Sequence, residues 1–279
     1  MVRVRWLLAG VAMACMISTA AQVDAKTIIS GVPAYTFPWD GIAKYPGCGP
    51  IAGGMLVGYW DDRGFPNLIE GSNAWNGNEV NVRNMIASDG YKTDYWPTPD
   101  RTPPPDGPPP PYHPDDSLAD FDHCSQYPLD RQAISTFTFQ LIGLLDYFTY
   151  RGYTGSTGSN KEVNPDPDAF WNDFVAEIDA KRPVELLVNS QVTGSVADHF
   201  VAAIGYDIDT EGRRKYVCYN GWDTAEHTYY YLPVGTLNPD GNTQWDVHGG
   251  TFFNAPEPAT MALMGLSGLV VLIRRRRRL

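Results

Sequence analysis

Apolar side chains recur at helical spacing in three parts of the chain. Ile51, Met55 and Tyr59 follow one another at intervals of four residues, which places them on one face of a helix. Similar spacing predicts helices over residues 134–150 and 167–180. Several glycines weaken the first helix in isolation, so we expect it to be buried with its neighbours packed close.

Strand patterns follow the last of these helices. Residues 183–189 begin them, and residues 198–207 form an apolar run that predicts a central strand. A polar turn over 210–214 separates this run from residues 215–223, which we expect to pair with it. Helices followed by antiparallel strands predict an α+β architecture.

The amino end has the pattern of an export signal. Arg3 and Arg5 precede an apolar run over residues 6–17, and small residues follow it. We therefore interpret residues 1–25 as a secretory signal peptide. Residues 26–255 remain, about 230 in number, which is the size of one ordinary domain.

The carboxyl end has three parts in a fixed order. A Pro-Glu-Pro sequence at 256–258 precedes fifteen largely apolar residues, 259–273, and then five arginines, 274–278. The apolar run is shorter than the roughly 20 residues of a straight membrane-spanning helix. The arginines would stay cytoplasmic, which places the domain outside the inner membrane.

Residues 256–279 resemble the PEP-CTERM sorting signal in all three parts. The resemblance implies processing by an exosortase and a transient inner-membrane anchor through 259–273. It further implies a final place at the cell surface, in the medium or in the exopolysaccharide matrix of a Gram-negative bacterium.

Charge excludes one class of function. The chain has 21 basic and 32 acidic residues, and seven of the basic ones lie in the two ends. Residues 26–258 keep 14 basic against 31 acidic side chains, a net charge near −17. Nucleic-acid binding needs clustered lysine and arginine, so we exclude it. We also expect no metal and no cofactor, because no pattern of ligands has the spacing they need.

Residues 97–114 hold ten prolines in eighteen positions. Such a run favours extended polyproline II structure without a core of its own. We expect an exposed loop, with a segment that docks a partner as the alternative.

The exported domain keeps three cysteines, Cys48, Cys124 and Cys218. An odd number in an oxidising compartment suggests one free, reactive thiol, and a Cys124–Cys218 bridge is permitted. Cys48 lies in a Gly-Cys-Gly-Pro turn at the expected start of the first helix, where free N–H groups and the helix dipole favour a thiolate. The alternative is a buried structural cysteine.

His199 and Asn220 are the candidates to assist that thiol. His199 opens the central strand, and Asn220 ends the strand expected to pair with it. Strand pairing would bring the two together. Taken alone, His199 fits a core histidine better than a catalytic one, but the order Cys48, His199, Asn220 and its spacing are similar to those of papain-type enzymes.

These motifs resemble the papain-like cysteine peptidase superfamily. The Gly-Cys-Gly-Pro start is similar to the branch that processes bacteriocin leaders after a double glycine, and Tyr-Asn-Gly-Trp is similar to the segment around the papain asparagine. The resemblance implies a papain-like α+β fold, in which a helix carrying the cysteine packs on an antiparallel sheet. It also implies a peptide or peptide-like substrate.

The implied roles follow the chemistry of a triad. Cys48 would attack an acyl carbon, His199 would take and return a proton, and Asn220 would fix the imidazole, with Asp223 as the alternative third member. We expect the pKa of Cys48 to lie below the usual value of about 8.5.

The oxyanion hole is where the chain departs from the family. The Cys48 N–H would supply one donor, but no glutamine lies between Gln22 and Gln126 to supply the second. Trp39, Lys44 and Tyr45 are the nearby donors. Two functions stay open: a cysteine hydrolase of amide bonds, and a catalytically silent surface or matrix binding protein on the same fold.

Overall fold

The computed structural model describes residues 26–36, 45–76, 79–94, 116–125, 135–194 and 196–256. The expected signal peptide, the proline-rich segment and the apolar run before the arginines lie outside these residues. The domain boundaries therefore stay predictions.

The described residues form six helices. The three helices expected from apolar spacing are α1, α5 and α6, and three short helices lie between α1 and α5. Their bounds are α1 Cys48–Asp61, α2 Val80–Ile86, α3 Asp89–Asp94, α4 Leu118–Phe121, α5 Phe137–Tyr150 and α6 Pro167–Asp179.

The strands form one seven-stranded sheet in the order β2-β7-β3-β4-β5-β6, and β1 also pairs with β4. Every pairing between named strands is antiparallel. An α+β chain with an antiparallel sheet is therefore confirmed. The bounds are β1 Thr27–Ile28, β2 Thr157–Glu162, β3 Val184–Val188, β4 His199–Ile208, β5 Arg214–Tyr219, β6 His227–Tyr230 and β7 Val247–Asn254.

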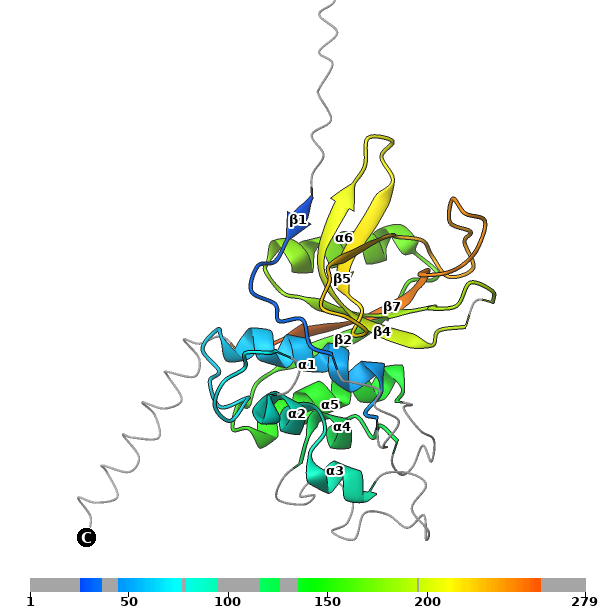
Figure 1. The fold of residues 1–279 in the computed structure, drawn as a ribbon. Coiled ribbons are helices and arrows are strands. Elements are labelled where there is room, and N and C mark those ends of the chain that lie inside the picture. Colours follow the sequence, from blue (N-terminus) through cyan, green and yellow to red (C-terminus); the bar gives the residue numbers. More distant parts are fainter. Residues whose placement is uncertain are drawn as a thin grey trace, which may run out of the picture.

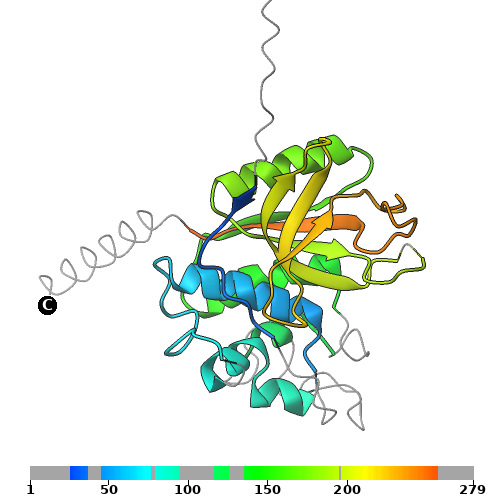
Figure 2. The same ribbon diagram turned by 45° about the horizontal axis from the view of Figure 1, so that its top comes forward.

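Helices cover both faces of the sheet (Figures 1 and 2). On one face, Phe170 of α6 packs edge-on against Phe252 of β7, with ring centroids 5.6 Å apart. On the other face, Phe148 of α5 packs against Phe253, the next residue of β7, at 4.6 Å. Successive residues of a strand point to opposite faces, so β7 joins both layers to the sheet.

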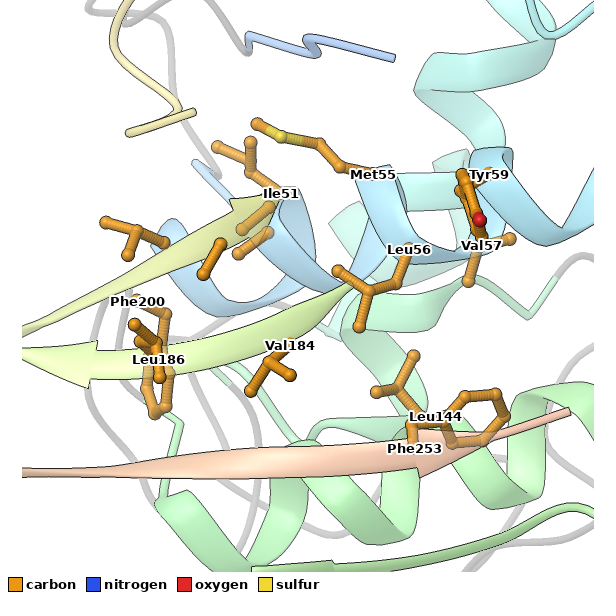
Figure 3. Packing of buried hydrophobic residues seen from close by; sticks show 14 of the residues in the cluster. Ile51, Met55, Leu56, Val57, Tyr59, Leu144, Val184, Leu186, Phe200 and Phe253 are labelled. Carbon is orange, nitrogen blue, oxygen red and sulfur yellow. The ribbon is translucent and has the colours of Figure 1, made fainter. Parts of the chain in front are cut away.

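Helix α1 packs on β3 and β4 and also contacts α2, α4 and α5, and α5 packs beside it on β2 and β7 (Figure 1). Almost all residues of α1 are buried, as expected of a helix that is apolar on every side. Leu56 of α1, Leu144 of α5 and Phe253 of β7 belong to one buried cluster (Figure 3). Each such side chain contributes about 1.5–3 kcal/mol by leaving water. The expectation that the glycine-containing helix is buried is confirmed.

Candidate active site

Cys48 is the first residue of α1. Gly47 precedes it with a φ of 86°, a left-handed conformation that favours glycine, and provides no side-chain cap. No side chain of the N-cap residue therefore accepts from the first N–H groups of the helix, and these can act on the Cys48 thiol instead. Those of Cys48 and Gly49 point at its sulfur and lower the pKa of the thiol.

The Cys48 sulfur also meets strand β4. The backbone N–H of Phe200 lowers the pKa of this thiol, and Phe200 directly follows His199 in the strand. Burial nevertheless dominates and, together with the nearby Glu185 carboxyl, raises the pKa of Cys48 to about 11. The direction is opposite to the one we expected, because burial outweighs the N–H donors at the helix start. At neutral pH the resting group is a thiol.

His199 is held by the main chain. Its Nε2 lies 2.8 Å from the carbonyl oxygen of Asn220, and its side chain is buried. A carbonyl oxygen only accepts, so Nε2 carries the hydrogen and Nδ1 of the neutral ring keeps a free lone pair. Burial lowers the pKa of His199 and outweighs the Asn220 carbonyl and Asp198, which raise it. The resting imidazole is therefore a neutral base.

Two indoles flank this ring. Trp222 stacks on His199 with centroids 4.5 Å apart and planes 29° from parallel, and Trp245 meets it edge-on at 6.0 Å. Trp222 is 54% exposed, so the histidine lies just beneath the molecular surface. The rings restrict rotation of the imidazole about its hydrogen bond.

The Asn220 side chain serves the turn after β5. Its Oδ1 accepts from the backbone N–H groups of Trp222 at 3.0 Å and Asp223 at 3.4 Å. Asn220 thus contacts the imidazole as expected, but through its main-chain carbonyl. The Asp223 side chain accepts from Nε2 of His227 at 3.0 Å, on the surface, and not from His199.

No hydrogen bond joins the Cys48 thiol to the His199 ring in the part of the chain that the structure describes. The two are nonetheless brought to one place, since α1 packs on β4 and the N–H of Phe200, next to His199, acts on the thiol. The site therefore holds a neutral thiol on α1 and a neutral imidazole on β4, which are adjacent elements.

Of the proposed oxyanion donors, only Tyr45 and the Cys48 N–H can be placed. Tyr45 is partly buried, and burial together with the nearby Cys48 and Cys124 thiols raises the pKa of its hydroxyl. Trp39 and Lys44 lie outside the described residues.

The other two cysteines are buried free thiols, so the permitted Cys124–Cys218 bridge is not formed. The Cys124 thiol donates to the carbonyl oxygen of Pro46, two residues before Cys48. Burial raises the pKa of both Cys124 and Cys218.

Sequence reasoning missed one polar side chain at the site. Gln140 of α5 is fully buried, and a Cβ at Gly49 would lie 2.3 Å from its Nε2. Only a glycine at position 49 therefore leaves room for this amide beside the cysteine. A glutamine between Phe139 and Leu141 in α5 was the signal that could have revealed it.

Sequence comparison identifies the end of the chain. A family model for the PEP-CTERM protein-sorting motif matches residues 254–278. The chain is an exported protein sorted by an exosortase. No curated protein has significant similarity to it. Within the described ranges, no helix is long and apolar enough to cross a membrane, and no group of three or more histidine, cysteine or acidic side chains could hold a metal ion.

Proposed function

We propose that this exported protein is a papain-like cysteine hydrolase of amide bonds, with Cys48 as nucleophile and His199 as base. One observation carries the proposal. The sulfur at the start of α1 contacts β4 directly beside a buried histidine whose Nε2 is committed to a carbonyl. That leaves Nδ1 as the basic atom available to a thiol.

The reaction begins from a neutral pair. As substrate binds, the Cys48 proton passes to Nδ1 of His199 and the sulfur attacks the carbonyl carbon. When the C–N bond breaks, the imidazolium returns the proton to the leaving amine. Water then cleaves the thioester with His199 again as base. The N–H of Cys48 stabilises the oxyanion.

Labelling tests the proposal. An electrophilic peptidyl probe at pH 7.5 should label the full chain at Cys48, and Cys48→Ala should abolish that label. His199→Gln should slow it about 10²–10⁴-fold, the usual contribution of a general base. His227→Gln is the matched control, because His227 lies near the surface and pairs with Asp223. Equal labelling of the His199 variant and the parent would contradict the proposal.

The alternative is a binding protein without turnover. The raised pKa of the resting thiol and the missing thiol–imidazole hydrogen bond favour it. It predicts that Cys48 reacts no faster with the probe than an ordinary thiol, and that removing Cys48 leaves ligand binding unchanged.

A further inference from the structure

Three polar side chains lie together in the interior behind Cys48. They are Asp122 in the turn after α4, Gln140 of α5 and Glu185 of β3, and each is 0% exposed. None of their carboxyl or amide atoms completes a hydrogen bond of good geometry in the described part of the chain. We call them the buried cluster. Unsatisfied groups at this depth call for a physical reason, because each costs free energy.

The buried cluster adjoins the thiol on two sides. The Gln140 amide packs on Gly49, the residue after Cys48. Glu185 acts electrostatically on Cys48 and also on Asp122, and the Gln140 amide favours the ionised form of Asp122. The three side chains thus link α5, the turn after α4 and β3 to the first turn of α1.

The titratable groups that face the cluster are acids. Asp120 acts on Asp122 from α4, and the Cys124 thiol lies in the following turn. Strand β7 contributes only a neutral hydroxyl, because Thr251 lies opposite Glu185 and donates to Asn160. No lysine or arginine acts on either carboxyl in the described ranges.

A buried carboxylate without a cation is strongly disfavoured, so the group keeps its proton instead. Burial accordingly raises the pKa of Glu185 well above its usual range. Burial raises that of Asp122 in the same way, and Glu185 adds to the effect. Both are carboxylic acids when their neighbours are neutral.

We propose that Glu185 is a positioning residue that controls the charge on the Cys48 sulfur, by holding a proton within the buried cluster. While Glu185 is neutral, no carboxylate in the buried cluster repels a negative charge on the Cys48 sulfur. When Glu185 loses its proton to solvent, the carboxylate repels the thiolate. The inference rests on the proposed function only for the reaction that the Cys48 sulfur performs; the effect of Glu185 on the charge of the sulfur does not depend on it.

Alkylation of Cys48 tests the proposal without requiring catalysis. The rate of iodoacetamide modification is followed in the full chain from pH 6 to 11.5, and mass spectrometry of the Cys48 peptide separates it from the other thiols. Glu185→Gln keeps the size of the side chain and removes its ionisation. It should move the midpoint of the Cys48 profile about one unit toward lower pH. Glu162→Gln, the same change at an exposed acid of β2, should leave the profile unchanged.

The outcomes are distinct. A shift with Glu185→Gln alone supports the proposal, even where no hydrolysis is found. A profile equal to that of the parent, in a variant that is folded by circular dichroism, overturns it. Failure of probe labelling together with a shifted profile refutes the hydrolase and not the role of Glu185.

A second measurement does not depend on the variant folding. The infrared C=O band of protonated carboxylic acids in the parent chain should persist at pH 7. Absence of that band at pH 7 would overturn the proposal, since Glu185 would then already be ionised.

Discussion

The Nε2 atom of His199 is hydrogen-bonded to the main-chain carbonyl of Asn220, at 2.8 Å. The side chain of the same asparagine accepts two N–H groups of the turn that follows. Orientation of the imidazole therefore depends on the conformation of a turn. This arrangement separates the contribution of the Asn220 side chain from that of its carbonyl.

Asn220→Ala should slow probe labelling of Cys48 by about 3–10-fold, the loss expected when one ordinary hydrogen bond is removed. The carbonyl that holds His199 remains, but the turn loses its side-chain acceptor. Asn220→Asp retains that acceptor and should label at nearly the parent rate. A loss as large as that of His199→Gln would mean that the amide itself acts on the ring.

Labelling should fall on the acid side, at a pH lower than the usual histidine pKa of about 6.5. His199 must be neutral to accept the Cys48 proton, and burial keeps its folded-state pKa below the usual value. Linkage gives the same direction for stability: the contribution of His199 is present above the unfolded pKa and is lost as the pH falls through the folded one. The pH dependence of labelling and of Tm checks both, and His199→Gln should flatten the acid limb of the Tm curve.

Cys124 and Cys218 should resist modification in the folded chain at pH 7.5. Both are buried, and burial raises the pKa of each thiol. Peptide mapping after brief iodoacetamide treatment should therefore find Cys48 modified first, because it alone of the three is partly exposed. Equal modification of all three in folded protein would contradict this order.

Gly49→Ala should destabilise the domain by about 1–3 kcal/mol, the range for overpacking a filled interior. The new methyl group would occupy the position of the Gln140 amide. Gly152→Ala is not a suitable control, because its φ of 91° strains any side chain. Gly49→Ala combined with Gln140→Ala should instead recover part of the loss in urea unfolding, because the shorter side chain frees the space.

The sequence predicted the elements that have regular apolar spacing. Helices α5 and α6 lie where expected because their apolar residues recur at helical spacing, and β3 and β4 lie where expected because each is a largely continuous apolar run. Strand β2 was not predicted, since Thr157–Glu162 is polar and largely exposed and is held by its pairing with β7. The strand predicted over residues 215–223 ends earlier, at Tyr219, because the Asn220 side chain accepts hydrogen bonds within the turn that follows.

For the candidate site, spacing indicated which residues meet but not which atoms. Both carbonyl and amide oxygens can accept from an imidazole, so a sequence does not distinguish the two contacts of Asn220. The pKa of Cys48 was predicted in the wrong direction because a helix start is visible in sequence and its depth of burial is not. Asp122, Gln140 and Glu185 come together only in the folded chain, from three separate elements.

Helix α1 has a consequence for the order of events during export. The Cys48 sulfur at the start of this helix comes close to His199 and Phe200 only when β4 packs on the helix start, and β4 lies about 150 residues later in the chain. Until then Cys48 is an ordinary thiol without a base beside it. The arrangement proposed to be reactive would therefore form only when folding is complete, and a chain still crossing the membrane would hold no assembled site.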